Sequence, residues 1–335
     1  MKKFNVVLIG AGSIGAMKPD DLDGPDIKYA LTHASALYKL QQYFNFMGIV
    51  DANPELARKA GEKWGTCATT NIVSFMPQFC DEIDVAVIAV NTENHVRAVL
   101  DSLDCFKNLK MIVLEKPCGE YKRNCTEIMN AIYDLKIPVK VVVNYTRRYE
   151  PFHKTVANNI IDEKYGKIYS ARFHYTRGLQ RDGCHAIDLA NWFFGRCLSV
   201  TKHSNFYIND YSAKDLTIPV VAEYERCPLV TFNPCDGRKY SIFELEILTE
   251  KGKISIYESG QKIMLVKPSP DNVYGKYNSL KYDLNVTELT TQLKESLVFL
   301  YRDVYNYLTT GEDVSCTLKD ALEVHRIIET IRRTD

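Results

Sequence analysis

The sequence predicts an α/β protein of two domains: a doubly wound parallel sheet at 1–145 and an α+β domain with a large, mostly antiparallel, open sheet at 146–335. Three observations predict this class. A chain of 335 residues exceeds what one hydrophobic core usually covers. Short apolar runs alternate with helical patterns as far as residue 145. After residue 152 strand patterns follow one another instead.

Apolar runs and amphipathic segments alternate in the first domain, as they do in βαβ units. The run VAVIAV is apolar at every position, which is typical of a strand buried on both faces of a parallel sheet. We expect strands at 4–10, 44–51, 67–70, 84–90, 111–116 and 138–145, and helices at 54–65, 94–106 and 125–136.

The second domain reads as a series of strands closed by two helices. We expect strands at 167–176, 217–224, 228–234, 240–248, 253–259 and 261–266. The turn stretches TEKGK and YESGQK predict that the last three strands form hairpins. One helix is expected at 288–311, where it stops at a glycine. The other is expected at 317–333, where Thr317 and Asp320 form a near capping box.

Charge and cysteine content exclude several classes of protein. Lysine and arginine total 42, as do aspartate and glutamate, so no electrostatic footprint for nucleic acid or an anionic membrane exists. No apolar run approaches the ~20 residues of a membrane span. The ten cysteines include no CxxC pair and no Cys/His group with zinc spacing. We therefore expect a cytoplasmic protein with reduced thiols, no metal, and no nucleic-acid or membrane partner.

The first strand runs into GAGSIG (10–15), whose three glycines have the spacing of a dinucleotide-binding turn of the Rossmann type. Such a turn launches a long helix, yet Pro19 follows four residues after the last glycine. An acidic residue is expected ~20 residues past the glycines. Asp51 lies 36 residues after Gly15, and 21 if residues 16–30 are left out. The fingerprint is therefore complete, with an insertion inside its helix.

The inserted segment contains the acidic stretch DDLDGPD. Its glycine comes fourth rather than sixth when Asp21 is taken as the first position, which does not fit an EF-hand calcium loop. A solvated loop is the simpler interpretation, and a flap over the cofactor is the alternative. The glycine turn itself has a plain alternative too, a tight strand–turn that holds no ligand.

The stretch MIVLEKPCGE places Lys116 at the carboxyl edge of the fifth parallel strand, where doubly wound sheets bind their ligands. Pro117 restricts the backbone of the lysine away from helix, so the lysine is held at the crevice. A lysine that is partly buried there is able to exchange a proton near neutral pH.

The stretch RGLQRDGCHAIDLANWFFG places His185 near the start of a helix and Asp188 one turn further on the same face. This pairing suits an acid–base histidine that a carboxylate orients. The alternative is a surface histidine with a helix-capping carboxylate.

At these stretches the chain resembles the glucose–fructose oxidoreductase/inositol dehydrogenase (Gfo/Idh/MocA) family. The motifs that carry the resemblance are GAGSIG, IVDANPE, VNTENH, LEKPCGE, VNYTRRYEP, GCHAIDLANWFFG and CTLKDALEVHRIIETI. The family implies NAD(P)-dependent oxidation or reduction of sugars, cyclitols or nucleotide sugars. It also implies a homodimer or homotetramer built on the C-terminal sheet.

The motif spacing and the resemblance together name the expected site residues. The cofactor-binding set is Gly10, Ala11, Gly12, Ser13, Ile14, Gly15, Asp51, Asn91, Asn94, His95, Glu115, Lys116 and Asn144. The substrate-binding set is Lys116, Arg148, Arg181, Asp182 and His185, and the catalytic set is Lys116, His185 and Asp188. Glu93 and Arg147 lie in the same matched segments.

One position departs from the family pattern. Many sugar dehydrogenases of the family carry an aspartate four residues before the histidine, where this chain has Arg181, with Asp182 beside it. A buried Arg181 would need an anionic partner, such as a substrate phosphate or carboxylate. The plain alternative is that some of these arginines, Arg177 among them, pair with Glu150 or Asp182.

The expected activity is NAD(P)-dependent hydride transfer on a sugar or nucleotide sugar, with a role in surface polysaccharide synthesis as one setting. Asp51 favours NAD over NADP because its charge repels a 2′-phosphate, although Arg58 would soften that preference. Two alternatives stay open: a reductase or dehydrogenase of a non-sugar such as a dihydrodiol or cyclitol, and a nicotinamide-binding regulator without turnover.

Overall fold

The chain forms two compact units in the computed structural model, which describes residues 2–134, 138–271, 275 and 277–333. The first unit comprises Met1–Tyr149 and Lys294–Leu322, and the second comprises Glu150–Leu293 and Glu323–Asp335. The expected boundary at residue 145 lies close to the first crossing. The expected second domain at 146–335 is not continuous, because residues 294–322 belong to the first unit.

The first unit is built on a six-stranded, wholly parallel sheet with the strand order β3-β2-β1-β4-β5-β6. Its strands are β1 (Phe4–Ile9), β2 (Phe44–Val50), β3 (Cys67–Thr69), β4 (Val85–Ile88), β5 (Met111–Leu114) and β6 (Lys140–Val143). The central strands β4 and β5 are buried at every residue, as their continuous apolar sequence predicts. The doubly wound parallel sheet is thus confirmed.

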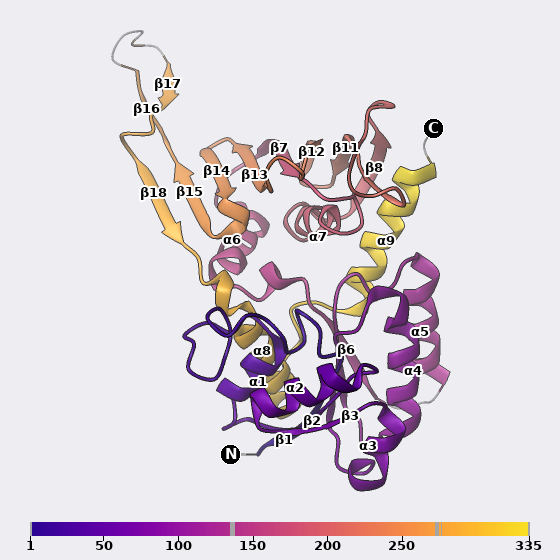
Figure 1. The fold of residues 1–335 in the computed structure, drawn as a ribbon. Helices are drawn as coiled ribbons and strands as arrows, with labels where there is room; N and C mark the ends of the chain where they lie inside the picture. The colour runs from indigo at the N-terminus through magenta and orange to yellow at the C-terminus, as the bar shows by residue number, and fades with distance from the viewer. Residues whose placement is uncertain (1, 135–137, 272–274, 276, 334–335) are drawn as a thin grey trace. The chain divides into compact units, whose positions relative to one another are not determined.

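Six helices cover this sheet: α1 (His33–Lys39), α2 (Pro54–Trp64), α3 (Ile72–Phe79), α4 (His95–Cys105), α5 (Lys122–Asp134) and α8 (Ser296–Thr310). Helix α1 packs beside α2 and α8, while α4 lies between α3 and α5 (Figure 1). The ends of α2 follow from its sequence. Asn53 accepts from two backbone amides at the first turn, Pro54 begins the helix, and Gly65 ends it with φ 64°.

The inserted segment interrupts a helix whose hydrogen-bond register continues across it. The amide of His33 donates to the carbonyl of Ile14 at 3.0 Å, and the amide of Ala34 donates to Gly15 at 2.9 Å. In an unbroken helix these partners are four residues apart. Here they are 19 apart (33 − 14), so 15 extra residues have been accommodated. That number equals the length of 16–30, as the spacing to Asp51 predicts.

The inserted segment at 16–30 is a loop, as expected, and residues 19–22, 25, 26 and 28 are exposed. It is nevertheless tied down at several points. Asp23 is fully buried and accepts from the amide of Leu31 at 2.9 Å and from the hydroxyl of Thr32 at 2.6 Å. The indole of Trp64 donates to the carbonyl of Ala16 at 2.8 Å. Lys39 donates to three successive carbonyls, those of residues 27–29. A loop with so many internal partners is part of the folded unit.

The second unit contains an eight-stranded mixed sheet with the order β18-β15-β14-β13-β7-β12-β11-β8. Its strands are β7 (Ile168–Tyr175), β8 (Cys197–Lys202), β11 (Val220–Tyr224), β12 (Cys227–Pro234), β13 (Phe243–Thr249), β14 (Gly252–Tyr257), β15 (Lys262–Val266) and β18 (Val286–Thr290). Only β7 and β12 pair in parallel among these strands, so the mostly antiparallel open sheet is confirmed. The two hairpins at β13–β14 and β14–β15 also match the sequence.

The remaining elements of this unit are shorter strands and helices: β9 (Ile208–Ser212), β10 (Asp215–Thr217), β16 (Pro268–Pro270), β17 (Asn278–Leu280), α6 (Pro151–Ile161) and α7 (Gly183–Phe194). Helix α9 (Leu318–Arg333) closes the described chain. The expected helix at 288–311 begins too early, because Val286–Thr290 pair with β15 as strand β18 and α8 starts only at Ser296. Pairing across the sheet overrides the local helical pattern there.

Two further expectations concern helix ends and membranes. Thr317 and Asp320 do cap α9, since the Asp320 carboxylate accepts from the Thr317 amide at 2.8 Å and from its hydroxyl at 2.7 Å. Within the described ranges, the helices are all too short or too polar to cross a bilayer.

Candidate functional site

The carboxyl ends of the parallel strands carry the glycine turn, and its three glycines differ in their surroundings. Gly10 has φ +102°, and a side chain there would collide with the backbone of Ala89. A side chain at Gly15 would collide with the carbonyl of Gly10. Gly12, by contrast, has nothing within 4 Å of the position that a Cβ would take. Two glycines therefore allow close packing, and the third leaves the backbone open to a ligand.

Asp51 follows strand β2 and lies against this turn. Its Oδ2 accepts a 2.7 Å hydrogen bond from the amide of Ala11, and its Oδ1 accepts a 2.9 Å bond from the amide of Asn53. The carboxylate is half-buried and keeps lone pairs for further donors. This orientation suits the hydroxyls of a ribose held beside the glycine turn.

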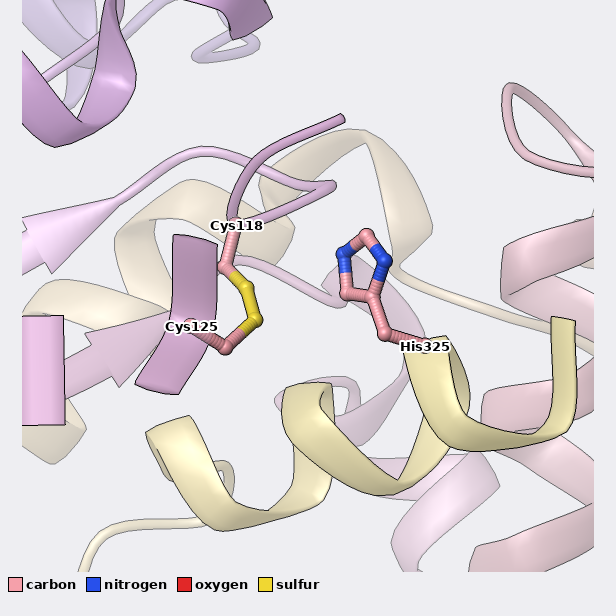
Figure 2. A group of neighbouring side chains, drawn as sticks. All are labelled: Cys118, Cys125 and His325. Atoms are coloured by element: carbon pink, nitrogen blue, oxygen red, sulfur yellow. A yellow bond between two sulfur atoms is a disulfide. The ribbon is translucent and has the colours of Figure 1, made fainter. Parts of the chain in front are cut away.

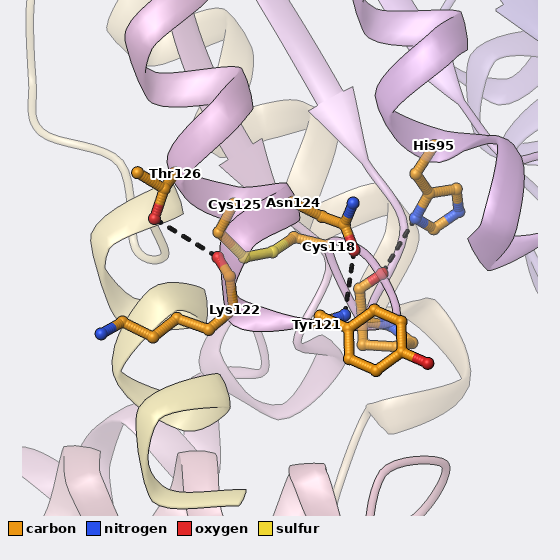
Figure 3. Close-up of a disulfide and its surroundings, with 8 residues drawn as sticks. His95, Cys118, Tyr121, Lys122, Asn124, Cys125 and Thr126 are labelled. Carbon is orange, nitrogen blue, oxygen red and sulfur yellow. Dashed lines mark hydrogen bonds between the residues drawn. A yellow bond between two sulfur atoms is a disulfide. The ribbon is translucent and has the colours of Figure 1, made fainter. Parts of the chain in front are cut away.

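Asn91, Glu93 and Asn94 follow strand β4 and form the short helix η1 (Thr92–Asn94) with its cap. His95, the next residue, is 1% exposed. Its Nδ1 lies 2.9 Å from the carbonyl of Pro117 (Figure 3). Its Nε2 lies 3.0 Å from the carbonyl of Val90. Burial lowers the pKa of this imidazole. The imidazole of His95 therefore lies between the end of β4 and the segment after β5, within hydrogen-bond distance of a carbonyl of each.

Glu115 comes directly after strand β5 and is 7% exposed. Its Oε1 lies 2.9 Å from His33 Nε2 and accepts a 2.5 Å hydrogen bond from Asn144 Nδ2, while His33 Nδ1 lies 2.9 Å from the hydroxyl of Tyr301. Burial alone would raise the pKa of Glu115, but the bonds from His33 and Asn144 and the charge of Lys116 lower it. The glutamate is therefore a buried carboxylate beside Lys116.

The sequence predicts Glu115 and Asn144 as site residues but gives no sign of His33 and Tyr301. His33 begins α1, immediately after the insertion, and Tyr301 lies 268 positions away on α8. No motif links these positions, so only the fold reveals the contact.

Cys118 and Cys125 form a disulfide, with both residues fully buried (Figure 2). The expectation of reduced thiols is therefore wrong for this pair, although the other eight cysteines form no disulfide. The disulfide joins the segment after Pro117 to helix α5. Between the two cysteines, the amide of Tyr121 donates to Asn124 Oδ1 at 2.9 Å (Figure 3).

Arg147 and Arg148 lie in the short helix η2 (Thr146–Arg148), where they are 8% and 5% exposed. Arg148 Nη1 lies 3.1 Å from a carboxylate oxygen of Asp320, the residue that caps α9. The guanidinium of Arg148 therefore has an acidic partner within its own unit.

In the second unit, helix α7 carries His185 and Asp188. His185 is half-buried, and its ring stands edge-on to Phe243 at a centroid distance of 6.2 Å. Asp188, one turn further, is 1% exposed. The helix that the sequence predicts at this histidine is confirmed.

Arg177 and Arg181 lie in the loop before α7, and Arg177 Nε donates to Asp182 Oδ2 at 2.8 Å. The side chain of Arg181 is 43% exposed, lies 4.2 Å over the ring of Tyr211, and is 3.9 Å from Asp182. Arg181 is therefore not buried, because the ring of Tyr211 covers the guanidinium on one side only. The condition under which it would need an anionic partner is not met.

Two aspartates that the sequence analysis missed hold the loop before α7. Asp215 accepts from the amides of Gln180 and Arg181 at 2.8 and 2.9 Å, and burial raises its pKa. Asp210 accepts from the amide of Arg177 at 2.7 Å and from the hydroxyl of Thr217 at 2.6 Å. These bonds outweigh burial and lower the pKa of Asp210.

The fold and site define a dinucleotide-binding α/β unit joined to a large mixed sheet, and comparison with known proteins agrees. Residues 4–141 match the model of an oxidoreductase family with an NAD-binding Rossmann fold, and residues 159–335 match its C-terminal alpha/beta domain. The chain therefore belongs to the Gfo/Idh/MocA oxidoreductase family.

Individual relatives are distant in sequence and similar in fold. The levoglucosan dehydrogenase of Pseudarthrobacter phenanthrenivorans is 28% identical over 182 residues, which cover 54% of this chain and 43% of that protein. The chain spans less than half the length of the curated relatives it matches. A structure of levoglucosan dehydrogenase with NADH and levoglucosan superposes with a TM-score of 0.78 at 17% identity, covering 99% of this chain and 97% of the other. The WlbA dehydrogenase from Bordetella pertussis, in complex with NADH and UDP-GlcNAcA, gives 0.74 at 16% identity, with coverages of 99% and 96%.

Proposed function

We propose that the chain is an oxidoreductase that uses NAD(H) to transfer a hydride to or from a CH–OH group of a sugar or nucleotide sugar. The observation that carries the proposal is the glycine turn, where Gly12 faces open space and Asp51 stands beside it. Membership of the family supports the cofactor. The sugar ligands named for the two similar structures support the substrate class.

The backbone amides of residues 10–15 are the proposed cradle for the pyrophosphate, and Asp51 is the proposed acceptor for the adenosine ribose hydroxyls. Asn91, Asn94 and His95 border the cofactor in this proposal, as do Glu115, Lys116 and Asn144. Their support is their place at the carboxyl ends of β4, β5 and β6.

Oxidation of a carbinol removes a hydride, which the bound nicotinamide accepts, and a proton, which we assign to His185. Asp188 orients the imidazole. Lys116 donates a hydrogen bond to the carbinol oxygen and stabilises the charge that develops there. In reduction the same groups act in reverse, and His185 returns the proton.

The roles are tested by hydride transfer, followed through nicotinamide fluorescence with nucleotide sugars, free sugars and cyclitols. Lys116→Met and His185→Asn are each expected to lower kcat by about 10²–10⁴-fold, the usual range for general acid–base help. The Kd for NADH stays near that of the wild type. The matched controls are Lys110→Met and His203→Asn, both exposed side chains. Full turnover in Lys116→Met or His185→Asn would remove that residue from the mechanism.

Arg148, Arg181 and Asp182 remain proposed substrate contacts, and a nucleotide-linked or acidic sugar is the proposed ligand of choice over its neutral parent. The UDP-GlcNAcA ligand named for one similar structure supports this proposal. We further propose a cytoplasmic homodimer or homotetramer.

A further inference from the structure

His33 occupies an unusual place in the first unit, because it contacts two segments of the proposed cofactor site at once. Its backbone amide donates to Ile14, inside the glycine turn. Its imidazole lies 2.9 Å from Glu115, at the end of β5 and next to Lys116. The side chain is fully buried, so no water competes for these contacts.

The partners of His33 fix the direction of one of its hydrogen bonds. A carboxylate oxygen only accepts, so His33 Nε2–H donates to Glu115. His33 Nδ1 lies 2.9 Å from the hydroxyl of Tyr301, whose pKa burial raises well above its usual value. The result is a connected chain of Tyr301, His33 and the Glu115 carboxylate, which Asn144 also holds.

We propose that His33 is a positioning residue, which fixes the Glu115–Lys116 segment relative to the glycine turn by donating to the Glu115 carboxylate. The proposal rests on the function proposed above for the chemistry of Lys116. The proposal also requires that the inserted segment leave the first turn of α1 in place. The Asp23–Thr32 bond and the Ile14–His33 bond fix the first turn of α1, so the imidazole keeps its place despite 15 inserted residues.

The charged and titratable groups that face Glu115 come from several elements. They are His33 on α1, Tyr301 on α8, His95 at the start of α4, and the adjacent Lys116. Loss of the His33 donor leaves Asn144 and Lys116 to balance burial, so the carboxyl group takes up its proton at a higher pH.

The test uses three variants of the full chain. His33→Leu removes the donor, His33→Gln keeps an N–H at a similar reach, and Tyr301→Phe removes only the hydroxyl behind the ring. The first readout is the ¹³Cδ signal of Glu115 in glutamate-labelled protein, assigned with Glu115→Gln and followed against pH. The second readout is kcat against pH.

For His33→Leu we expect the Glu115 midpoint to rise by about one pH unit or more, and kcat at neutral pH to fall about tenfold or more. The acid limb of the kcat profile, which His185 sets in the proposed mechanism, stays where it is in the wild type. His33→Gln stays within about threefold of wild-type kcat and keeps the wild-type midpoint, and Tyr301→Phe shifts the midpoint by less than half as much as His33→Leu.

A wild-type midpoint in His33→Leu, or an equal loss in His33→Gln and His33→Leu, would overturn the proposal. A residue that served stability alone would lower Tm without moving the Glu115 midpoint. If the wild type transfers no hydride with any sugar, the proposed function fails, while the carboxyl titration still decides the role of His33.

Discussion

Asp51 has two partners within the protein, and both bear on cofactor choice. Its carboxylate accepts from the amides of Ala11 and Asn53, so its charge is fixed beside the glycine turn. A fixed negative charge there attracts the two hydroxyls of an NAD ribose and repels the 2′-phosphate of NADP. Arg58 on α2 forms an exposed ion pair with Glu62, which leaves Asp51 to set the preference.

Asp51→Ser is expected to weaken NADH binding about tenfold and to strengthen NADPH binding, because a hydrogen bond to a charged group contributes ~1.5–3 kcal/mol. Fluorescence titration with each cofactor measures both effects. Asp101→Ser makes the same exchange in an exposed ion pair with Arg97 and serves as the control. Equal affinities of the wild type for NADH and NADPH would contradict this role of Asp51.

At the level of single residues, the sequence predicts those that belong to motifs. It misses those whose contacts are far away in the sequence. Asp51, Glu115 and Asn144 follow strands whose ends meet, so their positions could be predicted. His33 and Tyr301 meet across 268 positions of sequence, and no local pattern records that contact. The Cys118–Cys125 disulfide was missed because cysteine spacing alone does not report distance.

Among the elements, the inserted segment at 16–30 is the one about which the structure adds most to the sequence prediction. Residues 14 and 15 hydrogen-bond to residues 33 and 34 as they would within one helix. The segment 16–30 is therefore a loop whose two ends meet, and the hydrogen-bond register of the helix continues across it. The sequence could predict its length from the glycine-to-aspartate spacing, but not its packing, which depends on Lys39 and Trp64.

Deletion of residues 16–30 is expected to lower Tm, because it removes the partners that Thr32 and Trp64 have in this segment. The folded variant is expected to bind NADH within about threefold of the wild type, since the glycine turn itself is kept. Circular dichroism melting and NADH titration test this. Asp23→Asn, which weakens the tie to Thr32 inside the intact loop, is the comparison variant. A tenfold loss of NADH affinity in a folded deletion variant would instead make the segment a flap over the cofactor.

The sheet of the second unit contains a strand that the local sequence pattern predicts as helix. Residues 286–290 continue into a helical pattern, yet they pair with β15 as the edge strand β18. Hairpins such as β13–β14 could be predicted because their turns are short and rich in glycine. The pairing of β18 with β15 depends on a partner about twenty residues earlier, after the excursion through β16 and β17.

For the whole molecule, His325 on α9 makes stability depend on pH (Figure 2). Burial lowers the pKa of its imidazole to about 4. As the pH falls below 6.5 the unfolded chain binds a proton that the folded chain does not, so stability decreases until about pH 4. The loss from this group is up to ~3 kcal/mol, at 1.36 kcal/mol per pKa unit.

His325→Gln is therefore expected to flatten the decrease in the free energy of unfolding between pH 6.5 and 4. Urea unfolding at several pH values measures the slope. His203→Gln, at an exposed position, is expected to leave the slope unchanged. A slope that is the same in His325→Gln as in the wild type would contradict the assignment.

Binding of NADH at the glycine turn is the central claim, and a titration of wild type and Gly12→Val tests it most directly. Gly12 is not among the glycines with positive φ, and no atom lies within 4 Å of its Cβ position, so the variant is expected to keep the wild-type Tm. The valine side chain fills the space proposed for the pyrophosphate, and we expect NADH affinity to fall about tenfold or more. Gly24→Val, in the inserted segment, is the control and binds as the wild type does. No NADH binding by the wild type, or unchanged binding by Gly12→Val, would contradict the account.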